Sequence, residues 1–416
     1  MALRKAGDNS VTHFDVAVVG AGHGGAQAAI QLRQLGFAGS IGLIGDESEP
    51  PYERPPLSKE YLAGDRDFAR MLVRPEAFWA ERGVVLALGT RIAAVDPQAR
   101  TLTAESGRRF GYGSLIWAAG GTPRRLACAG GDLACVHVVR RKADVDAIRA
   151  ELDSVERVAV VGGGYIGLEA AAVLRKLGKD VVLVEALDRL LARVAGPEIS
   201  DFYAAEHRAR GVDVRLGASV AEILGRGGRA HGVRLQDGAA IAAGMVIAGI
   251  GVDAAVAPLL AAGAAGANGV EVDAFCRTSL PGVYAVGDCA AHENRFAGGL
   301  RVRLESVQNA HDQATTVAKA IVGRLEPYDA IPWFWSNQYD LRLQTVGLAV
   351  GHDSTVVRGR PADRSFSVLY LLEGRVIALD CVNATRDYVQ GRKLILEGRP
   401  VPAEKLADTA VQLKEL

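Results

Sequence analysis

Residues 13–36 read HFDVAVVGAGHGGAQAAIQLRQLG, and this stretch indicates the fold. A short apolar strand, residues 14–19, leads into Gly20, Gly22 and Gly25, and a pattern typical of an amphipathic helix follows. Gly20 permits a tight turn, Gly22 lets a pyrophosphate approach the backbone, and Gly25 lets helix and strand pack closely. The helix N-terminus supplies N–H donors for phosphate. A strand, a GxGxxG turn and a helix in this order predict a dinucleotide-binding unit.

The next strand, IGLIG, ends just before Asp46 and Glu47, and either acid can hold a ribose hydroxyl. By itself this pattern is also typical of a glycine-rich turn in some other α/β domain. Residues 157–185, RVAVVGGGYIGLEAAAVLRKLGKDVVLVE, repeat the whole unit about 140 residues later. Two complete units predict that the chain binds two dinucleotides. The repeated unit has its own turn glycines and closing acid, which are Gly162, Gly164, Gly167 and Glu185.

The acid that closes the second unit favours one nicotinamide nucleotide over the other. Glu185 can accept a hydrogen bond from a ribose 2′-OH and would repel a 2′-phosphate, so we expect NADH rather than NADPH. Arg189 and Arg193 follow closely and weaken this preference.

Residues 50–59, PPYERPPLSK, form a second distinctive stretch. Proline fixes φ and removes a donor, so the stretch is predicted to be a stiff loop. One interpretation is a rigid surface connection that ends with Ser58 as a helix cap. The other is a site that holds the cations Arg54 and Lys59 in place.

Length, charge and cysteine content bound the remaining possibilities. A chain of 416 residues should divide into two or three domains. Lys plus Arg and Asp plus Glu both number 48, which argues against an extended nucleic-acid or anionic-membrane surface. The N-terminal MALRKAGDNS has no apolar signal core, and no later membrane-length apolar run is free of charge or glycine, so we predict a cytoplasmic protein. The cysteines show no CxxC pair and no metal-ligand spacing, and therefore predict no metal site: Cys128, Cys135, Cys276, Cys289 and Cys381.

With these residues assembled, the sequence closely resembles the FAD-dependent, NADH-using ferredoxin reductases of bacterial oxygenase systems, the putidaredoxin reductase and biphenyl dioxygenase reductase type. The resemblance covers almost the entire chain. Besides both fingerprints and the PPLSK loop, it rests on SLIWAAGGTPR, TSLPGVYAVGDCA, LESVQNAHDQA and PWFWSNQYDLRLQTVG. The chain has AAG at 118–120 where the family usually has an ATG-like element.

The resemblance implies an α/β fold with two Rossmann-like dinucleotide-binding domains of the glutathione reductase type and a C-terminal α+β domain. The FAD-binding domain is expected at 1–118 and 252–328, interrupted by the NADH-binding domain at 119–251. The C-terminal interface domain is expected at 329–416.

The resemblance also implies roles for residues of the PPLSK loop and of the second unit. Lys59 is expected near flavin N5, paired with Glu169, while Arg54 is a further candidate for contact with the cofactor. Tyr165 is expected to be the lid that nicotinamide displaces. The alternatives are a solvated Lys59 in the first turn of a helix, a Glu169 favoured only by a helix N-terminus, and a packed Tyr165.

The remaining cofactor residues come from later segments. Gly287 and Asp288 follow an apolar strand, and Asp288 is expected to accept from a flavin ribitol hydroxyl; its alternative role is a helix cap. LESVQNAHDQA should begin a helix at Ser306 and Val307 that points N–H groups at the flavin pyrimidine. The resemblance places Trp335 against the flavin edge; its alternative role is packing in a core or an interface.

These expectations lead to one principal function and two alternatives. The principal hypothesis is NADH:ferredoxin reduction, with FAD passing electrons to a [2Fe–2S] ferredoxin that feeds a cytochrome P450 or a Rieske-type oxygenase. A disulfide reductase or NADH peroxidase would need a redox cysteine near the flavin, and PPYERPPLSK occupies that region. The last alternative is a flavoprotein of the apoptosis-inducing-factor type that acts through association. An acidic ferredoxin is expected to dock on a basic patch, for which Arg301, Arg303 and Arg342 are candidates.

Overall fold

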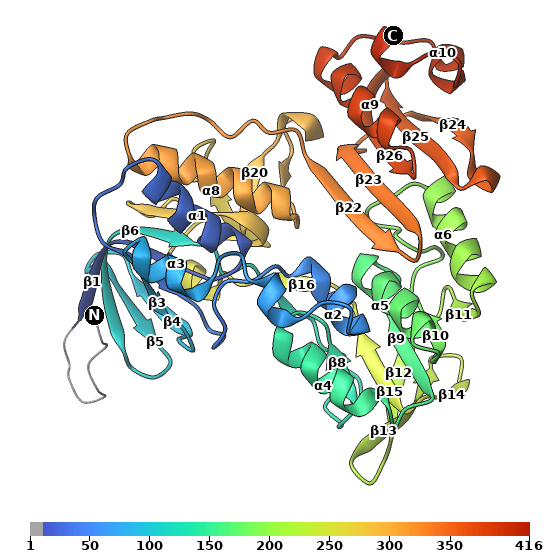
Figure 1. Cartoon of the computed structure of the whole chain (residues 1–416), viewed down its shortest axis with the longest axis horizontal. Helices are drawn as coiled ribbons and strands as arrows, with labels where there is room; N and C mark the ends of the chain where they lie inside the picture. Colours follow the sequence, from blue (N-terminus) through green and yellow to red (C-terminus); the bar gives the residue numbers. More distant parts are fainter. Residues whose placement is uncertain (1–10) are drawn as a thin grey trace. The chain divides into compact units, whose positions relative to one another are not determined.

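The computed structural model describes residues 11–416, so the N-terminal MALRKAGDNS, on which part of the cytoplasmic prediction depends, lies outside the described residues. The chain forms two compact units. Unit 1 contains the residues up to Glu53 together with Met71–Thr122 and Asp253–Ala330. Unit 2 contains Arg54–Arg70, Pro123–Val252 and Ile331–Leu416. Figure 1 shows the helices and strands of both units.

Unit 1 is built on a seven-stranded sheet in which β1 (Thr12–Val19) is central. Strands β3, β2, β1, β6 and β19 run parallel, and β4 and β5 extend the sheet beyond β6 as antiparallel strands. The other strands of this sheet are β2 (Ile41–Ile44), β3 (Val84–Ala87), β4 (Ile92–Asp96), β5 (Thr101–Ala104), β6 (Arg109–Trp117) and β19 (Val283–Ala285).

Successive residues of β1 point to opposite faces of the sheet and enter two different cores. On one face, Val16 and Val18 pack with α1 (His23–Gln34) and α8 (Val307–Ile321), which lie side by side (Figure 1). On the other face, Ala17 and Val19 join a core that includes α7 (Ala257–Ala261) and a small four-stranded sheet. The remaining elements of unit 1 are α3 (Glu76–Glu81), β17 (Gly266–Ala267), β18 (Gly269–Val272), η3 (Gly287–Cys289), β20 (Ala290–Glu293), η4 (Arg295–Ala297) and β21 (Arg301–Val302).

Unit 2 contains a five-stranded parallel sheet with the order β11-β10-β9-β15-β8. Its strands carry runs of Val, Ile and Ala that are buried, as expected for a parallel sheet covered on its faces. Helix α5 (Tyr165–Lys176) follows β9 directly and packs against β9 and β10. The other elements are β8 (Val136–Val138), α4 (Lys142–Leu152), β9 (Arg157–Val161), β10 (Asp180–Val184), α6 (Pro197–Ala209), β11 (Val212–Arg215), β12 (Val220–Arg226), β13 (Arg229–Leu235), β14 (Ala240–Ala242) and β15 (Met245–Ala248).

The C-terminal part of unit 2 is an antiparallel sheet with the order β22-β23-β26-β25-β24. Side chains alternate along β22 (Trp333–Gln338), so Phe334, Ser336 and Gln338 share one face, while Trp333 and Trp335 share the other. The remaining elements are β23 (Leu341–Gly347), β24 (Ser354–Arg360), η5 (Pro361–Asp363), β25 (Ser365–Leu372), β26 (Arg375–Val382), α9 (Thr385–Glu397), α10 (Ala403–Ala407) and η6 (Leu413–Glu415).

The predicted architecture is confirmed: two dinucleotide-type sheets, one mixed with five parallel strands and one fully parallel, are followed by a C-terminal α+β part. The predicted residue boundaries of the domains stay a prediction. The structure adds that Arg54–Arg70, which comprises η1 (Pro55–Ser58), α2 (Glu60–Ala63) and most of η2 (Phe68–Met71), belongs to unit 2. Two strands, β7 (Gly121–Pro123) and β16 (Val252–Ala254), span two of the points where the chain passes between units. Within residues 11–416, no helix has the length and apolar character needed to cross a bilayer.

Candidate functional site

The first glycine turn has the geometry that its sequence predicts. Gly20 has a φ of +107°, and a Cβ there would lie 2.2 Å from the Ala118 carbonyl oxygen. A Cβ at Gly25 would lie 1.9 Å from the Gly20 carbonyl oxygen. Gly22 is the N-cap of α1 and offers no side-chain cap. The first N–H groups of α1 are therefore left for another acceptor, and a dinucleotide phosphate fits this requirement.

The two acids after β2 are held at the same edge of the sheet. The Tyr52 hydroxyl donates to Glu47 Oε2 at 2.5 Å, and Arg91 lies 3.6 Å from an oxygen of Asp46. These contacts orient the carboxylates at the carboxyl end of a parallel strand, where this fold class binds nucleotides. Which of them contacts a ribose stays a prediction.

The Gly287–Asp288 turn, which the resemblance assigns to flavin binding, is held in unit 1 through hydrogen bonds to its backbone. Gly287 has a φ of +73°, and its N–H donates to Gln313 Oε1 at 2.7 Å. Arg303 Nη1 donates to the Asp288 carbonyl at 2.9 Å. Asp288 lies inside the short η3 turn, whose N-cap is Val286, so the helix-cap interpretation of Asp288 is wrong.

Helix α8 begins where the sequence predicts. Ser306 is its N-cap, with the hydroxyl accepting from Asn309 N at 3.1 Å, and Val307 is its first residue. Glycine turns without room for a Cβ, an uncapped α1 N-terminus and the α8 N-terminus together fit FAD on unit 1.

The second glycine turn repeats the geometry of the first in unit 2. Gly162 has a φ of +110°, and a Cβ at Gly167 would lie 2.0 Å from the Gly162 carbonyl oxygen. Gly164 is the N-cap of α5, again without a side-chain cap, and the space around its Cβ position is open. Glu185 Oε2 accepts from Gly163 N at 2.6 Å, so the closing acid is tied to the turn. These residues fit a second dinucleotide.

The two arginines after Glu185 differ in how they are used. Arg189 donates to the Ala192 and Ala195 carbonyls and to the Ser200 hydroxyl, so its guanidinium is engaged within its own loop. Arg193 is exposed. Arg189, one of the two cations that weaken the expected preference for NADH, is therefore already bound by acceptors of the protein.

The PPLSK loop forms η1, and its last two residues meet Glu169 of α5. Lys59 Nζ lies 2.6 Å from Glu169 Oε2, and the side chains of Lys59 and Glu169 are 12% and 2% exposed. The Ser58 hydroxyl donates to the same carboxylate oxygen at 2.5 Å. The pairing of Lys59 with Glu169 is thus present in the structure, and a solvated Lys59 is excluded.

Ser58 does not cap a helix, and that expectation is wrong. Residue 59 stands at the N-cap position of α2 and makes no side-chain capping hydrogen bond there, while Ser58 is buried and directed at Glu169. The loop also holds Arg54, whose Nη1 donates to the Arg140 carbonyl at 2.8 Å. Its expected contact with a cofactor stays a prediction.

A third donor reaches Glu169 from the C-terminal sheet. The Ser336 hydroxyl donates to Glu169 Oε1 at 2.6 Å, and Ser336 is fully buried. A buried carboxylate needs such compensation, because leaving its charge without partners costs several kcal/mol. Sequence reasoning missed the hydrogen bonds that Ser58 and Ser336 donate to Glu169. The alternation of WFWSNQ, which places a serine on the buried face of β22, is the signal that identifies Ser336.

Aromatic side chains surround the same region of unit 2. The Tyr165 ring lies against Phe334, with centroids 4.6 Å apart. Burial raises the pKa of Tyr165 well above its usual value, and the negative charges of Asp380 and Glu169 add to the effect, so its hydroxyl stays protonated. Trp335 has ring contacts with Trp333 and Phe334 and projects from the face of β22 opposite Ser336. The lid role of Tyr165 and the flavin contact of Trp335 stay predictions.

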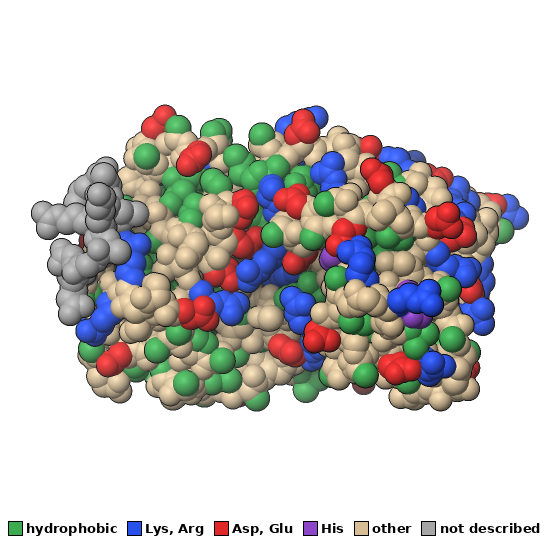
Figure 2. Space-filling view, turned by 90° about the horizontal axis from the view of Figure 1, so that it is seen from below, with side chains coloured by type: hydrophobic (Ala, Val, Ile, Leu, Met, Phe, Trp, Pro, Cys, Tyr) green, Lys and Arg blue, Asp and Glu red, His purple; other side chains and the backbone are tan. Residues whose placement is uncertain are grey.

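The arginines expected to form a docking patch are largely engaged with acids. Arg301 pairs with Glu271 and Glu293. Arg303 pairs with Glu305, and its side chain is only 11% exposed because it supports the Asp288 turn. Basic and acidic side chains lie interspersed on the face that Figure 2 shows. Arg303 is therefore too buried to belong to a docking patch, whereas the Arg301 side chain is 42% exposed and Arg342 of β23 is exposed in unit 2, so the docking roles of these two arginines stay predictions.

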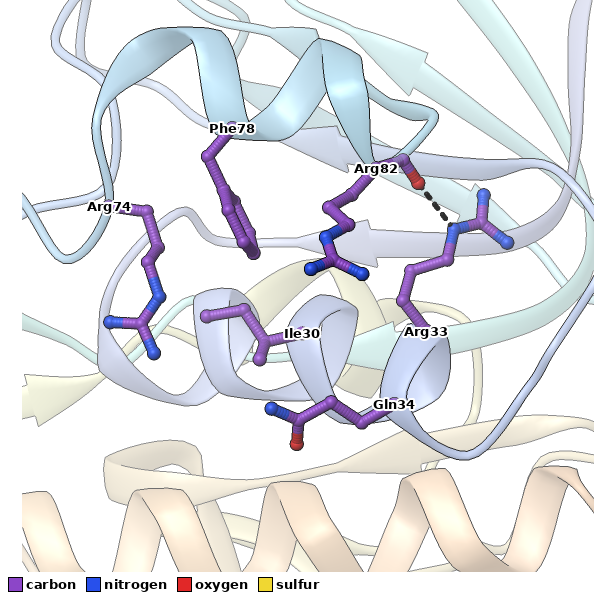
Figure 3. Close-up of a pocket in the computed structure, with 6 residues that line it drawn as sticks. All are labelled: Ile30, Arg33, Gln34, Arg74, Phe78 and Arg82. Atoms are coloured by element: carbon purple, nitrogen blue, oxygen red, sulfur yellow. Dashed lines mark hydrogen bonds between the residues drawn. The ribbon is translucent and has the colours of Figure 1, made fainter.

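A pocket in unit 1 lies between α1 and α3, away from the glycine turn (Figure 3). Phe78 projects between the guanidinium groups of Arg74 and Arg82, which lie 5.7 and 5.6 Å from its ring centroid. Arg33 Nε donates to the Arg82 carbonyl at 2.8 Å. The pocket faces the C-terminal half of α1, whereas a dinucleotide phosphate needs the N-terminal end, so it is separate from the candidate cofactor site.

Comparisons with known proteins agree with this geometry. Residues 14–314 match the family model for pyridine nucleotide-disulphide oxidoreductases, and residues 333–416 match the reductase C-terminal model. The chain is 62% identical to the ferredoxin reductase subunit of 5,5′-dehydrodivanillate O-demethylase from Sphingobium sp. (strain NBRC 103272 / SYK-6), over 97% of this chain and 98% of that one. It is 57% identical to a ferredoxin–NAD(P)(+) reductase from Sphingomonas sp., over 97% of both chains.

A solved structure with a similar fold is that of a covalent putidaredoxin reductase–putidaredoxin complex. It aligns with a TM-score of 0.93 at 37% identity, over 98% of both chains. The match extends through both units and the C-terminal sheet. The chain therefore belongs to the pyridine nucleotide-disulphide oxidoreductase family and, within it, to the ferredoxin reductases of oxygenase systems.

Proposed function

We propose that the chain is an NADH-dependent ferredoxin reductase in which FAD takes a hydride from NADH and delivers single electrons to a [2Fe–2S] ferredoxin that serves a P450 or Rieske-type oxygenase. The observation that carries the proposal is the buried Lys59–Glu169 ion pair. It joins the loop after the first dinucleotide unit to the helix that begins at the second glycine turn. The relatives' names support the same activity.

Lys59 supplies a fixed cation for the reaction. The prolines of η1 restrict the backbone, and Lys59 Nζ also donates to the Pro55 carbonyl at 3.1 Å, so the ammonium has little freedom. A fixed positive charge stabilises negative charge that develops nearby without reorganising during the reaction. Glu169 orients this ammonium, and the hydroxyls of Ser58 and Ser336 orient Glu169.

The residues of the second turn bind the nicotinamide nucleotide, with NADH preferred. Support comes from Glu185, whose carboxylate lies at the turn, and from Arg189, whose guanidinium is occupied by loop acceptors. A 2′-phosphate would meet the negative charge of Glu185. One relative is named as a ferredoxin–NAD(P)(+) reductase, and this name covers both nucleotides. The preference for NADH is our proposal within that class.

The thiols argue against disulfide reductase chemistry. No cysteine lies in PPYERPPLSK, and all five cysteines of the sequence are free thiols. Burial raises the pKa values of Cys135 and Cys289 to about 11, so at neutral pH they are not the thiolates that such chemistry requires. The association-type alternative is not favoured either, since the relatives described above are named reductases.

We further propose that the partner is a small ferredoxin and that the protein works in the cytoplasm, where NADH is available. The putidaredoxin complex supports a direct encounter between reductase and iron–sulfur carrier. The test is anaerobic: the purified yellow protein should be bleached by NADH much faster than by NADPH, and should then reduce a [2Fe–2S] ferredoxin from a panel of the same genome. Bleaching by NADH without reduction of any ferredoxin would reject the proposed partner class. Equal rates with NADH and NADPH would reject the nucleotide preference.

A further inference from the structure

A continuous line of hydrogen bonds runs from Glu169 through the interior of unit 2. Ser336 Oγ donates a hydrogen bond to Glu169 Oε1 at 2.6 Å and accepts one from Gln338 Nε2 at 3.3 Å. Gln338 Oε1 lies 2.9 Å from His207 Nε2, and His207 Nδ1 lies 3.0 Å from the Tyr339 hydroxyl. Ser336, Gln338 and His207 are all at most 1% exposed. The line therefore crosses a dry region from a buried carboxylate to a half-buried tyrosine.

The direction of every donor in this line follows from the carboxylate at its end. The Glu169 carboxylate can only accept hydrogen bonds, so the Ser336 hydroxyl must donate to it. Ser336 Oγ must then accept a hydrogen bond from the amide NH₂ of Gln338. The amide oxygen of Gln338 consequently faces His207, which must carry its proton on Nε2. A neutral His207 then accepts on Nδ1 from the Tyr339 hydroxyl. All four donors point toward Glu169.

The groups around this hydrogen-bonded chain keep His207 neutral and the Tyr339 hydroxyl protonated. Burial lowers the pKa of His207 to about 4, with Arg210 also disfavouring its cation while Gln338 and Glu206 oppose the shift. Burial raises the pKa of Tyr339 to about 12, so its hydroxyl remains a donor at neutral pH. The Arg210 guanidinium lies 4.3 Å from the Tyr339 ring centroid and pairs with Glu206 and Asp340. The outer end of the line is thus anchored in a cluster of ions.

We propose that Ser336, Gln338 and His207 are positioning residues that set the charge balance of the Lys59–Glu169 pair. This inference deepens the proposed function and rests on it. Donors aligned toward Glu169 stabilise its negative charge and limit how strongly it holds the Lys59 proton. The Lys59 cation then remains available to the bound flavin. Removing a donor should make Glu169 a stronger partner for Lys59, weaken the positive field and make flavin reduction harder.

The amide of Gln338 also determines whether this hydrogen-bonded chain can conduct protons. A primary amide holds its two N–H groups firmly and does not pass a proton along in the way a hydroxyl does. The line is therefore suited to polarising Glu169 rather than to conducting protons. Its effect should decline with distance from the carboxylate, in the order Ser336, Gln338, His207.

The experiment compares Ser336→Ala, Gln338→Met and His207→Leu in the FAD-loaded protein, with flavin midpoint potential and NADH reduction rate as readouts. Ser336→Ala should slow reduction about tenfold, as expected for one hydrogen bond to a charged group, and should make the potential more negative. Gln338→Met and His207→Leu should give progressively smaller changes of the same sign. His207→Gln, which can still donate to Gln338, should restore most of the parent behaviour.

Matched controls come from the same C-terminal sheet. Ser367 is fully buried in β25 and donates to Asp387, and Gln344 of β23 accepts from Thr385, so Ser367→Ala and Gln344→Met each remove a hydrogen bond of the same sheet that does not lead to Glu169. Both should lower thermal stability without moving the flavin potential. If Ser336→Ala shifts the potential no more than Ser367→Ala, the proposal is overturned.

Two further measurements separate the possible failures. Nitrogen NMR of His207 in the parent protein should show a neutral ring protonated on Nε2, and a proton on Nδ1 or a charged ring at neutral pH would overturn the proposal even if the variants misfold. Lys59→Met and Glu169→Gln test the underlying function. If neither slows reduction, the proposed role of the Lys59–Glu169 pair in the reaction fails; if both do and Ser336→Ala does not, only the positioning inference fails.

Discussion

The two glycine turns are nearly identical in backbone, and the helices that begin at them carry different side chains. The first glycines of the turns have φ values of +107° and +110°, and a Cβ at the third glycine would lie 1.9 or 2.0 Å from a carbonyl oxygen. Two residues beyond that glycine, unit 1 has Gln27 and unit 2 has Glu169. Gln27 is half-buried with one long hydrogen bond of 3.5 Å to Thr315, whereas Glu169 is buried in an ion pair.

The comparison extends to the first residue of each helix. His23 of α1 lies against His311, with ring centroids 5.7 Å apart, while Tyr165 of α5 lies against Phe334 at 4.6 Å. The turn itself is a dinucleotide-binding device that serves either unit. Under the proposed function, the side chains on the adjoining helix distinguish the unit that binds FAD from the unit that supplies the Lys59–Glu169 pair.

The largest effects should come from breaking each turn separately. Gly25→Ala and Gly167→Ala each force a Cβ into a carbonyl oxygen, which should distort the turn at a cost of several kcal/mol. Gly25→Ala should yield a protein that loses its yellow colour. Gly167→Ala should remain yellow and no longer be reduced by NADH. Absorbance of the purified variants and anaerobic NADH titration distinguish the two, and loss of FAD from both would contradict separate roles.

The next effect concerns the residue that differs between the units. Glu169→Gln leaves the Lys59 ammonium without its ionic partner in a site that is 12% exposed, and should destabilise unit 2 by about 3 kcal/mol. Gln27→Ala, at the matching position of unit 1, should cost less than about 1 kcal/mol. Thermal and denaturant unfolding measure both. Equal losses would mean that the Glu169 contacts add nothing beyond ordinary helix packing.

A smaller effect should appear in nucleotide choice. Glu185→Gln keeps an oxygen for the Gly163 N–H and removes the negative charge that opposes a 2′-phosphate. The preference for NADH over NADPH should narrow by about tenfold, which corresponds to about 1.4 kcal/mol. The ratio of kcat/KM values for the two nucleotides measures it. An unchanged ratio would assign the preference to another residue, and Arg193 would be the next to test.

The effect that is smallest near neutral pH should be a pH dependence of stability in both units, because it develops only in acid. Burial lowers the pKa of His292 in unit 1 and of His207 in unit 2 to about 4, below the usual 6.5. Between these values the unfolded chain binds the proton and the folded chain does not, so stability should fall as pH drops from about 6.5 toward 4. The full difference is about 3 kcal/mol for each histidine. Unfolding midpoints of His292→Gln and His207→Gln should show a shallower acid dependence than the parent; parallel curves would contradict this account.

The degree to which the molecule could be predicted differs between backbone and side chains. Gly20, Gly25, Gly162 and Gly167 could be assigned from sequence, because the turn leaves no room for a Cβ and the flanking strand and helix are local patterns. The three donors to Glu169 come from two segments more than 100 residues away from it, since |i−j| is 110, 111 and 167. Local patterns do not contain such contacts.

The wrong expectations have the same physical origin. A serine beside a helix start is usually a cap, but Ser58 lies in a short η1 turn and is directed at a buried carboxylate from another segment. Arg303 was expected to be available to a partner, and it is instead held by Glu305 and by the Asp288 carbonyl. Lys59 and Glu169 were paired through resemblance, and the geometry of unit 2 confirms the contact.

Anaerobic stopped-flow reduction of Lys59→Met by NADH tests the central claim most directly. Lys176→Met is the matched control, because Lys176 pairs with Asp65 on the surface of the same unit and its side chain is 60% exposed. The account predicts that both variants bind FAD, that Lys176→Met is reduced at the parent rate, and that Lys59→Met is reduced about a hundredfold more slowly. A yellow Lys59→Met protein that NADH reduces at the parent rate would contradict the claim that the Lys59–Glu169 pair serves the reaction.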